Sequence, residues 1–205
     1  MKRGERVVIS TFYEGFAIKH IIPKLSPDKL VILIDEPKDN EKKKKMENTL
    51  TSIKEFFKGA VEIETLKISS YDIPKIISQV IKKIDIESSK GNKILVHITE
   101  GRKTTSLAVL FAAYIKKEKI EGAYYITEEE HNLIKLPILN FELNHTKKNL
   151  LKLIERGVTD INKLTSQLKI KQSAIYQNIN ELSKEGYIEK ENGIKLTDLG
   201  KIMAV

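Results

Sequence analysis

Short apolar runs alternate with longer segments whose apolar residues recur at helical spacing over most of the chain. The apolar runs are predicted strands, at residues 5–10, 29–36, 60–68 and 93–99. The segments after them are predicted helices, at residues 15–22, 40–58, 72–84 and 106–115. A hairpin is predicted next, from residues 122–127 and 133–139, with Pro137 marking an edge strand. This alternation predicts an α/β fold with a mostly parallel sheet that ends in a β-hairpin.

The pattern changes at residue 147 to three short amphipathic segments and a hairpin, at residues 147–157, 160–168, 171–186 and 187–201. This order resembles a small winged helix-turn-helix. Asp160 is placed to cap the second helix, and the Glu-Asn-Gly turn at 191–193 is a hairpin signal for the wing. Inward-facing positions predict one small core, formed by Leu150, Leu151, Ile154, Ile161, Leu164, Leu168, Ile175, Ile179, Leu182 and Ile188. We therefore predict two domains, residues 1–142 and 147–205.

Composition narrows the classes of function. The 205 residues contain no cysteine, and the four histidines are scattered without ligand spacing, so we expect neither disulfides nor a metal site. The chain has no apolar run of membrane-spanning length and no signal-peptide pattern, which predicts a cytoplasmic protein without a membrane partner. The net charge of +8 favours a polyanionic partner, although a surface rich in Lys and Glu is also typical of thermophilic proteins.

The clearest ligand-binding pattern lies in residues 93–117. An apolar strand leads through the turn Thr99–Thr104 directly into a predicted helix. The first N–H groups of a helix have no partner within the helix, and the glycine of this turn lets the backbone approach a ligand closely. Arg102 and Lys103 add positive charge at a helix end where cations are unfavourable to the helix dipole. Their position favours an external anion, such as a phosphate, over a solvated first turn.

The usual nucleotide-binding signatures are missing from the chain. Neither GxGxxG nor GxxxxGK[ST] occurs, which disfavours an NAD enzyme or a P-loop NTPase. Instead, Ser10 and Thr11 follow the first strand and residues 100–104 follow the fourth, where the loops of an open α/β sheet flank its ligand crevice. Phe12 and Tyr13 continue the first loop, and an aromatic ring there can either stack on a nucleobase or pack beneath the loop.

The order of the two domains, the hydroxyl residues after the first strand and the Gly-Arg-Lys-Thr turn at 101–104 resemble the CRISPR-associated Rossmann-fold (CARF) family. The resemblance is to its archaeal transcription regulators, which carry a C-terminal winged helix. It implies a Rossmann-like first domain, a role in antiviral defence and a homodimer. It also implies a cyclic oligoadenylate ligand, chiefly cyclic tetra-adenylate, bound across the two-fold axis, and no further cofactor.

The resemblance assigns roles to individual residues. Ser10 and Thr11 would face a ribose or a phosphate of the ligand. Gly101 and Arg102 would supply backbone and guanidinium contacts, and Lys103 would hold a phosphate or a ribose hydroxyl.

Two further positions of the same turn complete the predicted site. Thr104 would cap the helix. Glu100 differs from the small or amide residue usual in the family, and its charge would oppose a phosphate unless it pairs with Arg102 or a ribose hydroxyl. The predicted ligand site comprises Ser10, Thr11, Phe12, Tyr13, Thr99, Glu100, Gly101, Arg102, Lys103 and Thr104.

The third helix of the second domain is the predicted recognition helix for double-stranded DNA. Gln and Asn side chains can read adenine edges in the major groove, and Lys and Tyr commonly hold phosphates. The predicted DNA-binding residues are Lys171, Gln172, Ser173, Tyr176, Gln177 and Asn180 on the helix, with Lys190 and Lys195 at the wing. Residues 147–205 contain 11 Lys and Arg against 7 Asp and Glu, a balance of 11 − 7 = +4. The alternative is a winged helix used for protein contacts or dimerisation.

Two functions are compatible with these patterns. The first is a ligand-responsive regulator of CRISPR–Cas transcription, in which the bound ring changes the orientation of two winged helices. The alternative is a ring nuclease, in which the CARF domain cleaves cyclic tetra-adenylate without a metal and Ser10, Thr11 and Lys103 are catalytic. In the regulator there are no catalytic residues.

Three smaller features complete the sequence analysis. The helix at 106–115 is apolar nearly all round, with Val109, Ala112 and Ala113 at positions that a one-sided helix would leave polar, so we expect it to contact both the sheet and a second copy. The basic run 42–45 is typical of a solvated helix face and is assigned no function. His97 lies within a strand and is expected to be a satisfied core residue.

Overall fold

The computed structural model describes residues 4–35, 37, 39–69, 71–139, 143–191 and 193–204. The chain divides into two compact units, Met1–Ile138 and Leu139–Val205. Residues 140–142, at the end of the first predicted domain, lie outside the described residues.

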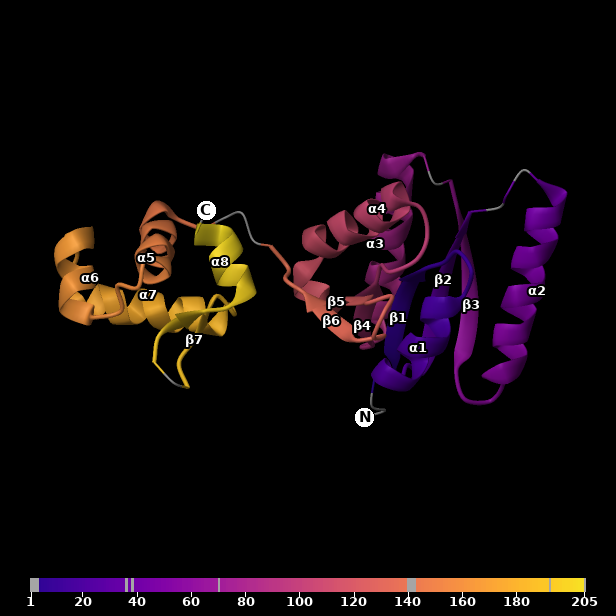
Figure 1. Ribbon diagram of the computed structural model, residues 1–205, viewed down its shortest axis with the longest axis horizontal. Coiled ribbons are helices and arrows are strands. Elements are labelled where there is room, and N and C mark those ends of the chain that lie inside the picture. The colour runs from indigo at the N-terminus through magenta and orange to yellow at the C-terminus, as the bar shows by residue number, and fades with distance from the viewer. Residues whose placement is uncertain are drawn as a thin grey trace. The chain divides into compact units, whose positions relative to one another are not determined.

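The first unit is built on a six-stranded sheet with the order β3-β2-β1-β4-β5-β6 (Figure 1). The first five strands are parallel and β6 is antiparallel to β5. The strands are β1 (Arg6–Thr11), β2 (Lys29–Asp35), β3 (Glu62–Ile68), β4 (Lys93–His97), β5 (Ile120–Ile126) and β6 (Leu133–Leu136). The predicted Rossmann-like, mostly parallel sheet with a terminal hairpin is confirmed. Pro137 lies one residue beyond β6, since a proline cannot donate to the strand ladder.

Helices cover both faces of the sheet. Figure 1 shows α3 (Ile73–Ser89) and α4 (Lys103–Ile115) together on one side and α2 (Asn40–Phe56) on the other, and α1 (Phe16–Leu25) shares a hydrophobic core with α2. A short 3-10 turn, Lys117–Lys119, follows α4. Alternate strand residues point to opposite faces, so Val7 and Ile9 contact the α3–α4 side, whereas Val8 contacts the α1–α2 side. The central strands are therefore buried on both faces, as parallel strands usually are.

An ion-pair network links the amino ends of β2 and β3 to α3. The Lys29 ammonium lies 2.8 Å from Glu62 Oε1, 2.9 Å from Glu64 Oε2 and 3.6 Å from Glu87 Oε1. Glu87, on α3, is fully buried and also pairs with Lys83 at 3.0 Å and with Lys90 at 3.2 Å. Burial alone would raise the pKa of Glu87, but hydrogen bonds from Lys83, Lys90 and Asn92 outweigh it and hold the pKa near 2.

The second unit has three helices and a hairpin in the order predicted for a winged helix-turn-helix. They are α5 (His145–Glu155), α6 (Ile161–Leu168), α7 (Gln172–Lys184), β7 (Ile188–Glu189) and β8 (Lys195–Leu196). Asp160 caps α6 as predicted, because its carboxylate accepts from the Lys163 N–H at 2.9 Å. Of the ten predicted core residues, eight are buried, and Ile161 and Leu168 are partly buried against the same core.

A last helix, α8 (Asp198–Ala204), corrects the prediction that residues 187–201 are only a hairpin. The Thr197 hydroxyl accepts from the Gly200 N–H at 3.1 Å and so stabilises the start of this helix. A Cβ at Gly200 would lie 2.2 Å from the Tyr187 carbonyl oxygen, so only glycine allows the close approach. Tyr187 and Met203 are buried in the core of this unit, although neither was among its predicted residues.

Candidate functional site

The carboxyl ends of β1 and β4 lie side by side at the topological switch point of the sheet, where the strand order reverses. Ser10 of β1 is the register partner of His97 of β4. The chain leaves β1 toward α1 on one face of the sheet and leaves β4 toward α4 on the other. Open α/β sheets bind ligands in the crevice between such loops. The two predicted loops therefore meet at the usual ligand position of this fold class.

The start of α1 is occupied by a carboxylate of the protein itself. Glu100 Oε2 accepts from the backbone N–H of Gly15 at 3.1 Å and of Tyr13 at 3.4 Å, and its Oε1 accepts from that of Ala17 at 3.2 Å. Unpaired N–H groups and the helix dipole stabilise an anion at a helix start. Glu100 does not pair with Arg102, the partner considered from the sequence, because the start of α1 takes its charge instead.

The start of α4 is built differently. Arg102 holds its N-cap position and makes no side-chain capping bond, whereas Asp39 and Asp72 cap α2 and α3. The prediction that Thr104 caps the helix is wrong, since Thr104 lies within the first turn. Lys103, the first residue of α4, is exposed. Two cations and the first N–H groups of a helix therefore lie together at this edge of the sheet.

Gly101 gives the loop after β4 a backbone conformation that favours glycine. Its φ is +92°, a left-handed conformation that residues with a side chain rarely adopt. A Cβ at this position would come to 3.4 Å from Thr11 Cβ and 3.5 Å from the Phe12 carbonyl oxygen. These are ordinary contact distances, so the left-handed backbone is the feature that favours glycine here, and the close approach to a ligand stays a prediction.

The Arg102 side chain reaches the neighbouring strand ends. Its Nε lies 3.6 Å from Asp35 Oδ2 at the end of β2, and its guanidinium carbon lies 5.1 Å from the ring centroid of Tyr71, which follows β3. The Arg102 side chain is 55% exposed, and an exposed ion pair is worth only about 0–1 kcal/mol. The contact holds the guanidinium at the sheet edge only weakly, so another anion can compete with Asp35 for it.

Asp35 and Tyr71 were missed by the sequence analysis, which considered only the loops after the first and fourth strands. Both residues follow strands whose carboxyl ends lie at the same sheet edge. The rule that places ligands at the carboxyl edge applies equally to these two loops and would have found them.

A chain of hydrogen bonds lies beneath the two loops. The Ser10 hydroxyl donates to the Thr11 carbonyl at 2.9 Å, and Ser10 Oγ lies 2.8 Å from His97 Nδ1. On the other side of the ring, Thr99 Oγ1 lies 2.6 Å from His97 Nε2 and accepts from the Ile126 N–H at 2.7 Å. The chain thus links the carboxyl ends of β1, β4 and β5.

The directions of these bonds follow from the charge state of His97. Burial lowers the pKa of His97 to about 3, so the ring is neutral near pH 7 and carries one proton. Since the Ser10 proton goes to Thr11, Nδ1–H of His97 donates to Ser10, and Nε2 accepts from the Thr99 hydroxyl. His97 is therefore a satisfied core residue, as expected from the sequence.

The residues predicted to bind ligand divide into a buried, a half-buried and an exposed group. Ser10, Thr11 and Phe12 are buried, and Phe12 packs into the α1–α2 core beneath the loop. The Thr11 hydroxyl oxygen has no hydrogen-bond partner among the described residues. The exposed group contains Arg102 and Lys103 together with Tyr13, whose ring is 68% exposed. The half-buried group comprises Thr99, Glu100, Gly101 and Thr104. The exposed side chains are the ones most accessible to a molecule at the surface of this unit as described.

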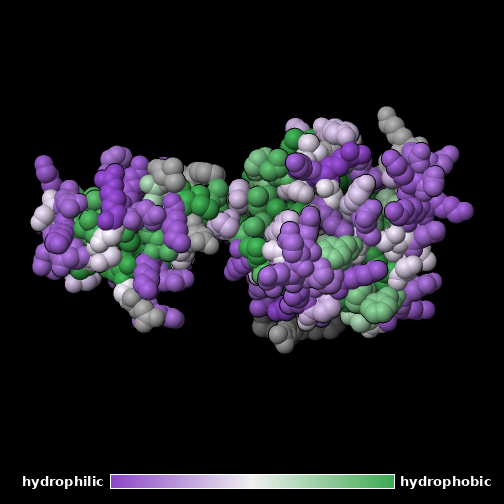
Figure 2. Space-filling model, viewed as in Figure 1, coloured by the Kyte–Doolittle hydropathy of each residue, from purple (hydrophilic) through white to green (hydrophobic). Residues whose placement is uncertain are grey.

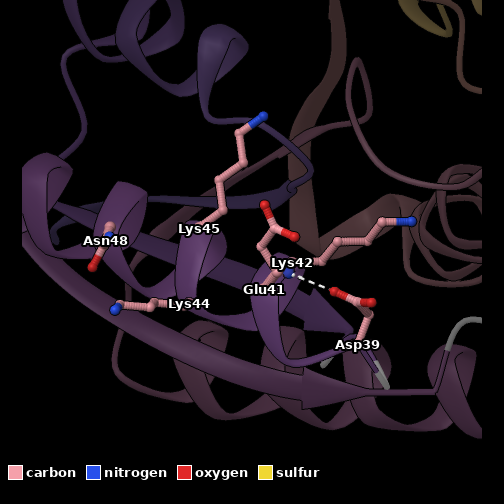
Figure 3. A pocket seen from close by; sticks show the side chains of 6 residues that line it. All are labelled: Asp39, Glu41, Lys42, Lys44, Lys45 and Asn48. Atoms are coloured by element: carbon pink, nitrogen blue, oxygen red, sulfur yellow. Dashed lines mark hydrogen bonds between the residues drawn. The ribbon is translucent and has the colours of Figure 1, made fainter.

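A shallow pocket of about 470 Å³ lies over the first turns of α2 and is lined by Asp39, Glu41, Lys42, Lys44, Lys45 and Asn48 (Figure 3). Figure 3 shows the three lysine side chains pointing in different directions from the helix. Lys45 Nζ lies 3.7 Å from Oε1 of Glu14, a residue of the β1–α1 loop. The lysines do not converge on one point, which agrees with the interpretation of this run as a solvated helix face.

Two histidines without assigned roles stack on each other beside α1. The ring centroids of His20 and His131 are 4.2 Å apart, and Phe16 lies 4.6 Å from His20 and 4.9 Å from His131. Burial, followed by the charge of His131, lowers the pKa of His20. The cluster joins α1 to the turn between β5 and β6.

All eight residues predicted to contact DNA are exposed in the second unit. Three of them take part in hydrogen bonds within the unit: Gln177 donates to Glu181 Oε1 at 3.0 Å, and Lys190 donates to Asn180 Oδ1. The Tyr176 ring, also on α7, is 51% exposed. Asn192, at the tip of the predicted wing, lies outside the described residues.

Two absences concern the described part of the chain. It holds no group of three or more His, Asp or Glu side chains arranged for a metal ion. None of its helices is long and apolar enough to cross a membrane.

Comparison with known families finds a match for each unit. Residues 6–137 match the family described as the Csa3 CRISPR-associated Rossmann-like domain. The chain belongs to this family. Residues 138–205 match the N-terminal domain of the methanogenesis regulatory protein FilR1. The resemblance of this Csa3-family chain to CARF regulators, inferred from its sequence, is confirmed.

Individual relatives of the Csa3-family chain are distant. An uncharacterized protein of Archaeoglobus fulgidus is 27% identical over 182 residues, which cover 80% of this chain and 81% of that protein. Csm6 of Enterococcus italicus, solved bound to cyclic hexa-2′-fluoro-hexa-dAMP, has a TM-score of 0.58 at 12% identity and covers 89% of this chain and 55% of its own. Protein VC1899 of Vibrio cholerae has a TM-score of 0.52 at 9% identity, with coverages of 97% and 64%. The chain spans less than two thirds of either solved chain, and at these identities the likeness shows the fold.

Proposed function

We propose that this protein is a DNA-binding regulator of CRISPR–Cas transcription whose first domain binds a cyclic oligoadenylate, chiefly cyclic tetra-adenylate. The observation that carries the proposal is the start of α4, where Arg102 and Lys103 lie beside the first N–H groups of a helix at the switch point of the sheet. Phosphates bind at helix starts because the helix dipole and the N–H groups of the first turn favour negative charge. Membership of the Csa3 family and the regulatory match of residues 138–205 support the same function.

The second domain is proposed to bind duplex DNA through α7. Its N-terminal half presents Lys171, Gln172 and Ser173 to solvent, and the N-terminal half of a recognition helix is the part that contacts base edges. Lys190 and Lys195 extend the surface onto the hairpin. Gln177 and Asn180 would exchange their internal partners for DNA on binding.

A homodimer is part of the proposal, and the structure changes which residues should form it. Val109, Ala112 and Ala113 are buried within one protomer, so they do not provide the contact expected from the sequence. Leu107, Phe111 and Ile115 are instead exposed at spacings of four residues on one face of α4, and Figure 2 shows hydrophobic surface in this region. An apolar stripe of this kind beside the ligand edge favours a symmetric contact between two copies.

The geometry favours the regulator over the ring nuclease. The Ser10 hydroxyl is buried and already engaged by Thr11 and His97, and the Thr11 hydroxyl is buried as well. A group that prepares a ribose hydroxyl for attack has to reach it within hydrogen-bond distance. Lys103 is the one residue of the predicted catalytic set that is exposed in the described structure.

Calorimetry with cyclic tetra-adenylate and a promoter duplex tests the proposal. We expect the ring to bind one protein dimer, to remain uncleaved, and to change the affinity for DNA by the same factor by which DNA changes the affinity for the ring. No binding of the ring at micromolar concentration would contradict a sensor. Ring binding with identical affinity in the presence and absence of DNA would leave two independent binding domains.

A further inference from the structure

The carboxylate of Glu100 joins two loops that lie far apart in the sequence. It extends from the loop after β4 and accepts from three N–H groups of the β1–α1 loop, at Tyr13, Gly15 and Ala17. Ser106, in the first turn of α4, donates to the Glu100 carbonyl oxygen at 3.3 Å. One residue therefore contacts the starts of both helices that border the crevice.

The start of α1 therefore already holds a negative charge of the protein itself. At α1, the N–H groups of Gly15 and Ala17 are already used by a charged acceptor, and charge-assisted hydrogen bonds are roughly twice as strong as neutral ones. A phosphate at α1 would have to displace this carboxylate and would meet its negative charge. At α4, the N-cap residue Arg102 makes no side-chain capping bond.

The packing around Gly15 makes the α1 start dependent on this cap. Gly15 has a φ of +80°, and a Cβ there would lie 2.8 Å from Ile53 and 2.9 Å from Thr49 of α2. The loop is thus held closely against α2 on one side and by Glu100 on the other. Gly15 itself makes no side-chain cap, so Glu100 supplies it from 85 residues away.

We infer that Glu100 is a positioning residue for the ligand site. It acts as an internal anion that fills the start of α1 and ties the β1–α1 loop to the β4–α4 loop, so that the two loops beside Arg102 and Lys103 keep the shape that the ligand meets. The inference rests on the proposed function for its ligand, but the internal cap itself does not depend on any ligand. It also explains why a carboxylate occupies a place so close to a site for a polyanion.

A comparison of Glu100→Ala with Glu14→Ala separates positioning from simple charge. Glu14 lies in the same loop and is exposed, and its contact in the described structure is a 3.7 Å ion pair with Lys45. Each variant removes one negative charge from the crevice. If Glu100 acted only by repelling phosphate, both variants would bind cyclic tetra-adenylate more tightly. We expect Glu100→Ala to bind at least tenfold more weakly and Glu14→Ala to bind equally or more tightly.

Hydrogen exchange provides a readout that needs no ligand. The amides of Tyr13, Gly15 and Ala17 should exchange at least tenfold faster in Glu100→Ala and unchanged in Glu14→Ala. Acetate added at high concentration should slow them again in Glu100→Ala alone, because it supplies the missing carboxylate. Glu100→Gln, which keeps one acceptor oxygen and the side-chain volume, should lie between Glu100→Ala and the wild type if the alanine variant folds poorly.

The outcomes distinguish this inference from the proposed function. Unchanged exchange of the three amides in Glu100→Ala, or tighter ring binding by it, would overturn the positioning role. Failure of the wild-type protein to bind the ring would overturn the proposed function alone, and the exchange and acetate results would still decide the internal cap.

Discussion

His97 Nδ1 lies 2.8 Å from Ser10 Oγ, and both side chains are fully buried on adjacent strands. Sequence reasoning placed Ser10 at a ligand and His97 in the core, and the contact joins them in one hydrogen-bonded chain. Buried polar groups are costly unless they are paired, so this chain holds the ends of β1, β4 and β5 in register beneath the proposed site.

Acid is expected to destabilise the protein in a pH range set by His97. Its folded pKa of about 3 lies below its unfolded value of about 6.5, so below pH 6.5 the unfolded state binds a proton that the folded state does not. The contribution of neutral His97 to the free energy of unfolding is fully present above pH 6.5. It is lost at about 1.4 kcal/mol per pH unit as the pH falls toward 3. Urea denaturation between pH 7 and pH 5 measures this slope.

His97→Gln is the control for the pH experiment, because it retains a donor and an acceptor but does not titrate. Its stability should vary less with pH over the same range. His20→Gln should keep most of the slope, although the pKa of His20 is also lowered by burial and by the charge of His131. Equal slopes in the wild type and His97→Gln would show that His97 is not the titrating group.

Glu87→Gln, which removes the buried carboxylate, should destabilise the first unit by about 3 kcal/mol at pH 7. Its loss leaves Lys29 and Lys83 without their buried partner. The pKa of Glu87 is held near 2, so its contribution is present above about pH 4.5 and is lost as the pH falls toward 2. Glu62→Gln removes an exposed partner of Lys29 and should cost less than about 1 kcal/mol. Denaturant unfolding of both variants tests the difference, and similar losses would contradict the buried role of Glu87.

Replacing Arg102 and Lys103 by alanine should weaken binding of cyclic tetra-adenylate by at least tenfold for each residue. A hydrogen bond to a charged group contributes about 1.5–3 kcal/mol, and both side chains are exposed at the start of α4. The double variant Lys42→Ala, Lys44→Ala removes the same charge from the α2 surface and should bind within about threefold of the wild type, a difference of less than 1 kcal/mol. Calorimetry that found equal losses in the two double variants would point to long-range charge instead of a site.

Phe111→Glu should convert the dimer to a monomer, because it places a charge in the middle of the exposed α4 stripe. Phe56→Glu is the matched control, since Phe56 is 81% exposed on α2 and lies outside the proposed contact. Sedimentation at micromolar concentration compares them. A monomeric wild-type protein, with or without the cyclic ligand, would contradict a shared ligand site.

DNA binding should become less dependent on salt when the charges of two surface lysines are reversed. Lys171→Glu with Lys195→Glu removes two proposed phosphate contacts, so the slope of log K against log salt should fall by about 2. Lys152→Glu with Lys201→Glu makes the same change of charge on α5 and α8 and should affect the slope less. Gln172→Ala should relax the sequence preference while preserving the slope. Absence of duplex binding at low salt would make the winged helix a protein-contact module.

Local patterns determined much of the fold. Strand runs, helical spacing and the Asp160 cap depend on residues within a few positions of one another, and the structure has these elements where the pattern predicts them. The cationic start of α4 is also local, because Arg102 and Lys103 follow a strand directly and precede a helix. These features could be predicted because spacing along the chain fixes which side chains share a face or a turn.

The tertiary structure alone decided the partners of the site residues. Glu100 finds its hydrogen bonds 83 to 87 residues away, and Ser10 finds His97 at the same separation of 87, so no local pattern contains these pairs. The exposed face of α4 depended likewise on which side met the sheet. An almost uniformly apolar helix offers several faces, and packing buried Val109 and Ala113 while leaving Leu107 and Phe111 exposed. Sequence determined the elements and their local charges, and three-dimensional contact determined which polar groups were already satisfied and which remained at the surface.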